Sequence, residues 1–260
     1  MIEKKKLDPL DLAERFWREF DREPDRGYGA GVVAVFEKLK QNLEKNLDPF
    51  EPASQQFGGK GSYGNGAAMR VHPVGLFFDD VDQVVESAKV SAKITHFNRD
   101  GINGAVLQAV ATHCALKDAT KEETIRILKN LAGTFDSEDG KLTYVEQLED
   151  VISMLEEPNH DFESGFELGN NVSAIESVPT TIYSFLKALD PVEGLETANP
   201  FERTVQLALT FGGDSDTICS MAGALAGAFY GESGIPGLNV DHVFQVFLTC
   251  YVFRLFSGFI

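Results

Sequence analysis

Cysteine is scarce in this sequence and is not spaced for a structural role. The 260 residues include only Cys114, Cys219 and Cys250, an odd number without the close pairing that metal sites use. We therefore expect neither a disulfide framework nor a zinc site, and the composition favours a reducing, intracellular compartment.

Basic residues are also few. Lys and Arg number 23 against 40 Asp and Glu, which gives a formal net charge of −17. Broad binding to DNA or RNA depends on clustered positive charge, so we expect no direct nucleic-acid binding. Any phosphate site must then be local and built from backbone amides.

A long uninterrupted apolar run is missing as well. The opening residues, MIEKKKLDPLDL, carry positive charge with no apolar stretch behind it, so they do not form a secretory signal. Residues 243–260 are crowded with aromatics, but Gln245, Arg254 and Gly258 interrupt them. We interpret this end as a core segment or an artefact of gene prediction, not as a membrane anchor.

Alternating apolar and polar residues, the pattern of a half-buried strand, do not extend far enough anywhere to predict one. Helical periods recur instead. Helix starts or spans are expected at Asp8 to before Pro24, Gly31 to about Leu43, from Asp80, Ala105 to Leu116, from Thr120, Tyr144 to Leu155, and from Pro179 and Pro200. The sequence predicts an all-α fold: a single compact, orthogonal multi-helix domain over residues 1–260, with 243–260 as an atypical apolar tail.

One short stretch, Phe211 to Ser220 (FGGDSDTICS), places two carboxylates and a hydroxyl behind two glycines. The glycines can end the preceding helix by taking positive φ, and we expect Asp214 to Thr217 on a tight loop. Such hard oxygen ligands suit Mg²⁺ or Ca²⁺. From the residues alone, a helix start capped by Asp216 or Ser215 explains the stretch at least as well.

The helix after this stretch carries a stripe of glycines, Gly223, Gly227 and Gly231. Glycine costs a helix about 1 kcal/mol per site relative to alanine. The stripe therefore indicates either close approach of another backbone or ordinary tight helix packing.

A second stretch, Phe57 to Arg70 (FGGKGSYGNGAAMR), is rich in glycine. Such a loop can turn successive amides inward as an anion nest, with Phe57 and Tyr63 beside it for a nucleotide base. It is neither a Walker loop, because Lys60 is followed by glycine, nor a Rossmann loop, because no strand precedes it. An ordinary flexible connection remains the alternative, and His96, Asn170 and Asn171 are likewise compatible with core roles.

Taken together, these stretches resemble the ADP-ribosylglycohydrolase family. The resemblance rests on five segments in the family's order: DRGYGAGV, GKGSYGNGAAMR, THFNRDGINGA, ELGNNVSAIESVPT and GGDSDTICSMAGALAGAFYG. It implies an all-helical enzyme that uses two Mg²⁺ ions to cleave ADP-ribose from its attachment site. The branch that removes ADP-ribose from serine and degrades poly(ADP-ribose) is the most similar.

The resemblance also implies which residues form the site. Metal ligands would be Asp214, Asp216 and Thr217. The ADP-ribose contacts would be Phe57, Lys60, Gly61, Ser62, Tyr63, Gly64, Asn65, Gly66, His96 and Val172. In the family, the metals hold ribose hydroxyls beside the anomeric carbon, and a carboxylate handles proton transfer.

Two family elements lie upstream of the region that aligns with Met1 to Val32: a catalytic glutamate and a Thr-Asp-Asp-Thr metal motif. We therefore assign no catalytic residue in this chain, and expect about the first quarter of the family's length to be missing. The second Mg²⁺ site would then be incomplete, and the chain by itself weakly active or inactive.

By the same resemblance, the partners are ADP-ribosylated proteins and poly(ADP-ribose), in the response to DNA damage, with no membrane contact. We expect a monomer in nucleus, cytoplasm and mitochondrion. The alternative function is a non-catalytic ADP-ribose-binding protein, since the diphosphate loop is intact.

Overall fold

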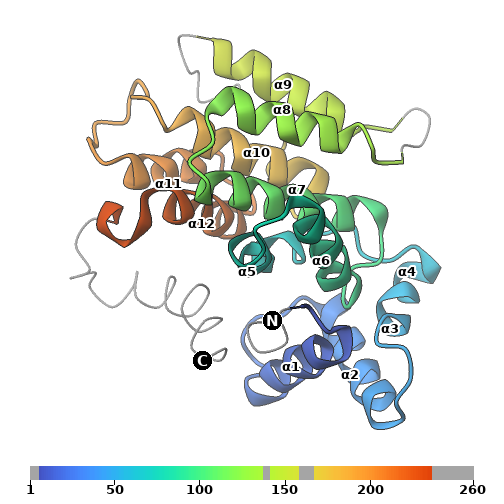
Figure 1. Cartoon of the computed structure of the whole chain (residues 1–260). Coiled ribbons are helices and arrows are strands. Elements are labelled where there is room, and N and C mark those ends of the chain that lie inside the picture. The colour runs from blue at the N-terminus through green and yellow to red at the C-terminus, as the bar shows by residue number, and fades with distance from the viewer. Residues whose placement is uncertain (1–5, 137–140, 158–166, 236–260) are drawn as a thin grey trace.

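The computed structural model describes residues 6–136, 141–157 and 167–235. Over these residues it contains twelve α-helices, one 3-10 turn and no β-strand, which confirms the predicted all-α fold (Figure 1). In chain order they are α1 (Pro9–Arg22), α2 (Ala30–Glu44), α3 (Glu51–Ser54), α4 (Gln56–Gly59), η1 (Ala68–Arg70), α5 (His72–Phe77), α6 (Val81–Lys93), α7 (Arg99–Leu116), α8 (Lys121–Ala132), α9 (Tyr144–Glu156), α10 (Ala174–Lys187), α11 (Pro200–Thr210) and α12 (Ser215–Gly234).

Helix α7 lies at the centre of the molecule (Figure 1). From Gly101 onward its sequence has no Asp, Glu, Lys or Arg, so all of its sides can be buried. Helices α5, α6, α10 and α12 pack around it. Gly104 allows a close approach, because a Cβ there would lie 2.5 Å from Tyr144 Oη and 2.9 Å from Ala174 Cβ. Helix α7 is thus a tightly held support for the segments at its N-terminus.

The second half of the chain packs on the same support. Helices α8 and α9 lie side by side along one edge, and α10, α11 and α12 pack against one another (Figure 1). Tyr183, Leu207 and Phe211 belong to a second, smaller cluster of buried side chains there. Phe211, which follows α11, belongs to this cluster, whereas Ile218 and Ala222 of α12 pack with Ala208 in a further one.

Helices α1 and α2 form a hairpin with a hydrophobic cluster of their own, in which Ala13, Phe36 and Leu39 are buried together with Ile94. Phe20 stacks on Phe36 with ring centroids 5.0 Å apart. The hairpin lies away from α8 to α12 in Figure 1. It is attached to the rest of the chain near α6 and η1.

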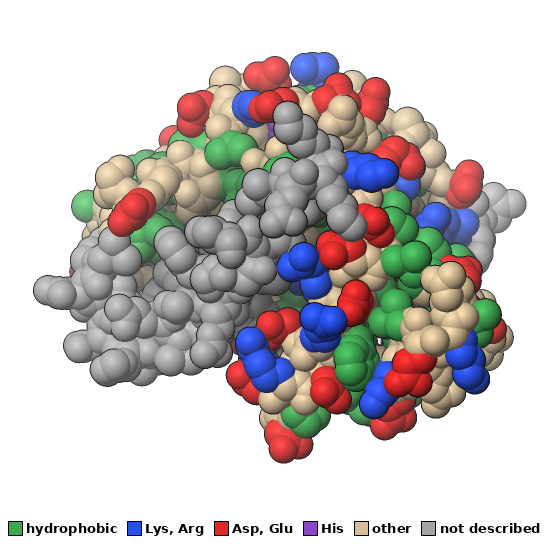
Figure 2. Space-filling view, turned by 60° about the horizontal axis from the view of Figure 1, so that its bottom comes forward, with side chains coloured by type: hydrophobic (Ala, Val, Ile, Leu, Met, Phe, Trp, Pro, Cys, Tyr) green, Lys and Arg blue, Asp and Glu red, His purple; other side chains and the backbone are tan. Residues whose placement is uncertain are grey.

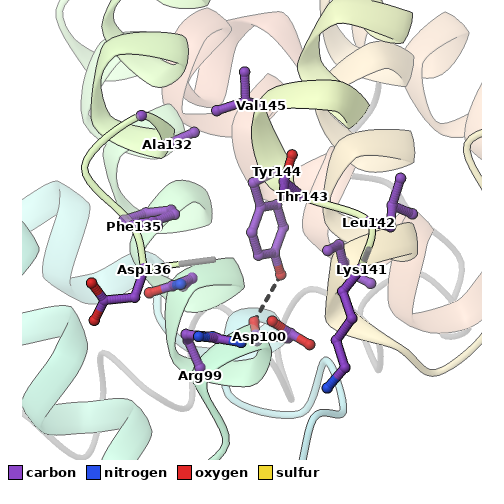
Figure 3. A pocket seen from close by; sticks show the side chains of 13 residues that line it. Arg99, Asp100, Ala132, Phe135, Asp136, Lys141, Leu142, Thr143, Tyr144 and Val145 are labelled. Carbon is purple, nitrogen blue, oxygen red and sulfur yellow. Dashed lines mark hydrogen bonds between the residues drawn. The ribbon is translucent and has the colours of Figure 1, made fainter. Parts of the chain in front are cut away.

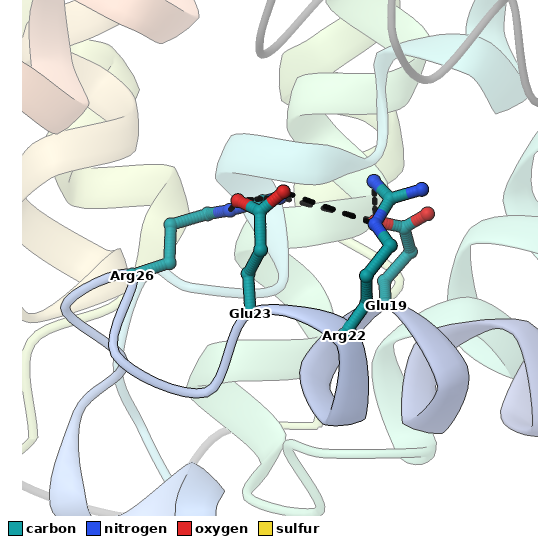
Figure 4. Close-up of polar contacts among 4 residues, drawn as sticks. All are labelled: Glu19, Arg22, Glu23 and Arg26. Atoms are coloured by element: carbon teal, nitrogen blue, oxygen red, sulfur yellow. Dashed lines mark hydrogen bonds and ion pairs between the residues drawn. The ribbon is translucent and has the colours of Figure 1, made fainter.

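Charges of both signs are interspersed on the surface, as the face in Figure 2 shows. At the end of α1, Arg22 and Arg26 form ion pairs with Glu19 and Glu23 (Figure 4). These side chains remain 30% to 55% exposed, so each pair contributes about 1 kcal/mol or less. Within the described ranges, no helix has the length and apolarity needed to cross a bilayer.

Most predicted helices are found, but some boundaries differ. Asp8, Asp80 and Thr120 are N-caps whose side chains accept bonds from the next turn, as predicted. Helix α7 begins at Arg99, before the predicted start at Ala105. The apolar tail 243–260 lies outside the described residues.

The predicted helix start at Pro179 is wrong, because this proline lies inside α10, which begins at Ala174. The start is fixed by the Ala174 amide, which donates to the carbonyl of Tyr63 over 3.1 Å. A contact between distant segments therefore holds this boundary, although the Ser173 to Glu176 spacing of a capping box also marks it in the sequence.

Candidate functional site

The glycine-rich loop, Lys60 to Gly66, is fastened against the N-terminus of α7. Gly61 has φ +68°, and a Cβ on it would lie 2.4 Å from the Asn98 amide nitrogen. The Asn98 side chain donates to the Lys60 carbonyl over 3.1 Å. A side chain at position 61 is excluded both by the backbone conformation and by space. The loop is thus an ordered element, not a flexible connection.

Several amides of this loop are free to bind a ligand. The Gly61 and Asn65 amides donate to the carbonyls of Gln56 and Val172. Across the described residues, the amides of Ser62, Tyr63 and Gly66 have no hydrogen-bond acceptor. Unpaired amides on a fixed loop are the donors that an anion nest requires.

Asn65 joins this loop to the acidic stretch. It is 5% exposed, and its Nδ2 donates to Asp214 Oδ2 over 2.6 Å and to Ser177 Oγ over 3.1 Å. The bond to Asp214 connects positions 149 residues apart. Two stretches that the sequence singled out separately are therefore parts of one site.

The turn before α12 places the Asp214 carboxylate next to Asn65. Gly212 and Gly213 have φ of +63° and +60°, as predicted, and a Cβ on Gly213 would lie 2.2 Å from the Asn170 carbonyl oxygen. The Asp214 amide donates to this carbonyl over 2.7 Å, and Asn170 Nδ2 donates to the Phe211 carbonyl over 2.6 Å. Asn170 thus holds the turn in place.

The helix-cap alternative for these acids is wrong. Helix α12 begins at Ser215, so Ser215, Asp216 and Thr217 form its first turn and not the expected loop. Asp214 stands at the N-cap position, but its carboxylate accepts no bond from the helix backbone. It accepts instead from Asn65 and, over 3.1 Å, from Thr217 Oγ1.

The electrostatics of this turn favour a cation. Burial, opposed by the Asn65 bond and reinforced by the neighbouring Asp216 carboxylate, raises the pKa of Asp214. Two carboxylates and a hydroxyl within one helical turn offer only hard oxygen donors, the set that Mg²⁺ accepts while keeping several waters. The residues present therefore fit a divalent cation.

His96 lies against the loop from the other side. It is 7% exposed, and its ring is so close to Gly66 that a Cβ there would lie 3.0 Å from Cε1. Burial, with the nearby Arg70 charge adding to it, lowers the pKa of His96 to about 3. The imidazole is neutral at physiological pH and is a weak base.

Exposed side chains include Phe57 and Tyr63, expected near the adenosine, and Val172, an expected contact of ADP-ribose. Phe57, Tyr63 and Val172 are 61%, 53% and 58% exposed, which is unusual for large apolar groups. Phe57 also has φ +51°. A non-glycine residue adopts this left-handed backbone conformation at a cost in free energy, and mostly where the surrounding structure holds it there. Their exposure leaves these side chains free to contact a ligand.

A further pocket lies beside the first turn of α7. It has a volume of about 240 Å³ and is lined by residues of α7 and α9 and of the segment after α8, including Arg99, Tyr144 and Phe135 (Figure 3). Tyr144 Oη donates to the Asp100 carbonyl over 2.8 Å. None of the predicted site residues lines it, whereas Phe57 lines a smaller pocket of about 190 Å³ beside Gly31.

Sequence reasoning missed several residues that hold the site. Arg70 and Thr95 contact the loop or His96, and Ser177 accepts from Asn65. All three residues stand inside segments that carry the family resemblance, which was the available signal.

Comparisons with known proteins identify the family of this chain. A family model described as ADP-ribosylglycohydrolase matches residues 1–251. The ADP-ribosylhydrolase ARH3 of Homo sapiens is 42% identical over 252 residues, which covers 91% of this chain and 68% of that protein. ARH3 of Xenopus tropicalis is 43% identical over 241 residues, with 87% and 68% covered.

A solved structure shows the same fold. The chain titled "ADP-ribosylglycohydrolase-related protein complex" superposes with a TM-score of 0.60 and 23% sequence identity, covering 95% of this chain and 74% of that one. This likeness supports the all-helical single domain. With the family model and the ARH3 relatives, it means that the chain belongs to the ADP-ribosylglycohydrolase family.

Proposed function

We propose that the protein is a Mg²⁺-dependent hydrolase that removes ADP-ribose from serine and degrades poly(ADP-ribose). The observation that carries this proposal is the Asn65 to Asp214 bond of 2.6 Å, because it joins a loop with free amides to a set of hard oxygen ligands. ARH3 relatives above 40% identity support the choice of substrate.

Each part of the site has a chemical role in this proposal. The free amides of Ser62, Tyr63 and Gly66 bind the diphosphate. Phe57 and Tyr63 contact the adenosine through exposed rings, while His96 and Val172 border the same ligand. Phosphate recognition by amides explains how a chain with a net charge of −17 binds an anion.

The acidic turn would hold the metal. Asp214, Asp216 and Thr217 supply its oxygen ligands, and Asn65 keeps the Asp214 carboxylate in place. When bound, Mg²⁺ supplies positive charge that orients the ribose hydroxyls next to the scissile bond. The second metal of the family and the nuclear, cytoplasmic and mitochondrial locations are part of the same proposal.

The alternative is a non-catalytic ADP-ribose-binding protein. The loop offers amides, exposed rings and a histidine with a pKa of about 3. These groups bind a ligand but transfer protons poorly at neutral pH. Binding without cleavage is the outcome that would favour this alternative.

Two measurements on the same chain separate these functions. Calorimetry with ADP-ribose tests binding, and release of ADP-ribose from a serine-modified peptide, with Mg²⁺ or with a chelator, tests hydrolysis. We expect binding and a weak Mg²⁺-dependent release, both lowered further in Asp214→Asn. Asp79→Asn, an exposed acid-to-amide change outside the site, is the matched control.

The outcomes are distinct. Heat of ADP-ribose binding without release of ADP-ribose from the peptide favours the non-catalytic binding protein. Release that persists unchanged in Asp214→Asn or in the chelator contradicts the metal assignment. If millimolar ADP-ribose gives no heat of binding and no ADP-ribose is released, both functions are contradicted.

A further inference from the structure

Arg70 is a partly buried cation behind the diphosphate loop. Its guanidinium lies 4.9 Å from the Phe16 ring centroid, and its Nε atom is buried with no acceptor among the described residues. No carboxylate within the described ranges lies at ion-pair distance from it. Burial lowers the pKa of Arg70 to about 10, so it stays charged at neutral pH. Taking a guanidinium partly out of water without a carboxylate partner is costly, so its neutral partners matter.

The two terminal nitrogens of Arg70 hold the site from behind. Nη1 donates to the Gly66 carbonyl over 2.6 Å. Nη2 donates to Thr95 Oγ1 over 2.6 Å and to the Ser91 carbonyl over 3.3 Å. One side chain thus fixes both the loop and the residue next to His96.

The Thr95 hydroxyl connects Arg70 to His96. Its oxygen lies 2.8 Å from His96 Nδ1. Because guanidinium can only donate, Thr95 Oγ1 accepts from Arg70, and its own proton is free for the histidine. A neutral imidazole that accepts at Nδ1 carries its proton on Nε2.

The Nε2 atom faces the loop. It lies 3.1 Å from the position that a Cβ on Gly66 would take, and 3.7 Å from the position that a Cβ on Gly64 would take. Nε2 has no hydrogen-bond partner among the described residues. An unused Nε2–H would therefore lie beside the glycine-rich loop.

We propose that Arg70 is a positioning residue that, through Thr95, fixes His96 as the Nε2–H tautomer and makes it a donor to a phosphate oxygen of a nucleoside diphosphate. The ligand part of this proposal rests on the proposed function. The tautomer part does not, because it follows from the contacts of the ligand-free chain.

His72 offers a matched contrast within the same molecule. Its Nδ1 also lies next to a threonine hydroxyl, Thr112 Oγ1, at 3.0 Å. That hydroxyl donates to the Gln108 carbonyl over 2.8 Å, so it accepts from His72. Burial lowers the pKa of His72 to about 4, and the neutral ring should be the Nδ1–H tautomer, opposite to His96.

The test is ¹⁵N NMR of the histidine rings at neutral pH, assigned with His72→Gln and His96→Gln. We expect a protonated Nε2 in His96 and a protonated Nδ1 in His72. Thr95→Val should remove the preference of His96 for the Nε2–H tautomer and leave the His72 tautomer unchanged. Thr112→Val should remove the preference of His72 for the Nδ1–H tautomer and leave His96 unchanged. Arg70→Met should have the effect of Thr95→Val on His96.

Calorimetry tests the ligand part. Thr95→Val should weaken ADP-ribose binding about tenfold and leave adenosine binding unchanged, since adenosine has no diphosphate. Equal loss for both ligands would indicate a merely structural role and overturn this part.

A protonated Nδ1 on His96 in the unaltered chain would overturn the proposal, even if no variant folds. If the tautomers are as expected but ADP-ribose does not bind at all, the proposed function fails and the Arg70 to His96 connection stands.

Discussion

At the scale of single residues, Asn65 has the largest effect on how the site is built. Asn65→Ala removes two buried donors and leaves the Asp214 carboxylate without its shortest bond. We expect a loss of about 1–3 kcal/mol in the free energy of unfolding, measured by urea denaturation. Asn42→Ala is the control, because Asn42 also donates two bonds but at the surface. Equal losses for both variants would contradict the role of Asn65.

The two buried histidines predict how stability depends on pH. The folded pKa values of His72 and His96, about 4 and 3, lie below the ordinary value of 6.5. The unfolded chain therefore binds protons first, and this contribution to stability is present above pH 6.5 and lost as the pH falls toward 4. Each histidine should lower the free energy of unfolding by up to about 1.4 kcal/mol per pH unit.

Urea denaturation between neutral pH and about pH 5 measures this slope, in a range where most carboxylates remain charged. Replacing both histidines with glutamine should remove most of it. A stability that stays constant over this range would contradict the buried, neutral state of these rings.

Local signals could predict the ends of many elements but not the contacts of the site. Caps such as Asp8, Asp80 and Thr120 act within one helical turn, so the sequence contains their whole mechanism. The bond from Asn65 to Asp214 depends on the packing of α7 and α12, and no short pattern encodes it. The five ordered segments did place both residues in one family site, before any geometry was known.

At the scale of elements, the helix glycines divide into two kinds. A Cβ on Gly223 of α12 would lie 3.7 Å from Val205 Cγ2, an ordinary contact. A Cβ on Gly227 would lie 4.0 Å from Phe201 Cε2, whereas Gly231 has φ +65°. Plain packing therefore explains Gly223 and Gly227, and the backbone conformation explains Gly231. The close approach occurs at Gly104 of α7, where Tyr144 Oη is only 2.5 Å from the corresponding position.

Alanine substitutions should separate these two cases. Gly223→Ala should stabilise the protein by up to about 1 kcal/mol through helix propensity. Gly104→Ala should destabilise it by about 1–3 kcal/mol through overpacking. Thermal unfolding measures both, and a destabilising Gly223→Ala would show that α12 packs more tightly than its contacts indicate.

At the scale of the whole molecule, the chain has parts of unequal stability. Helix α7 is enclosed by four other helices, whereas the α1–α2 hairpin has its own small cluster and joins the rest near α6 and η1. Amides in a part with few buried contacts exchange through local opening. We expect α1 and α2 to exchange hydrogen faster than α7 in mass spectrometry, and equal protection would contradict this division.

The hairpin nevertheless reaches the site. In α1 the Phe16 ring lies over the Arg70 guanidinium, and in α2 the Gly31 carbonyl accepts from Gln56 Nε2, next to Phe57. Phe16→Leu should therefore have a larger effect on ADP-ribose affinity than Phe20→Leu. Phe20 stacks within the hairpin cluster, so it serves as the control. The same calorimetric titration measures both, and equal effects would mean that the hairpin acts only through general stability.

The bond between Asn65 and Asp214 also concerns the order of events during synthesis. Its two ends lie 149 residues apart, and closing so long a loop has a large entropic cost. A growing chain on the ribosome can fold α1 to α9 while the glycine-rich loop has no acidic partner. The site is completed only after α12 has emerged and docked on α7, so a nascent chain arrested before Asp214 should not retain ADP-ribose, however well its first helices have formed.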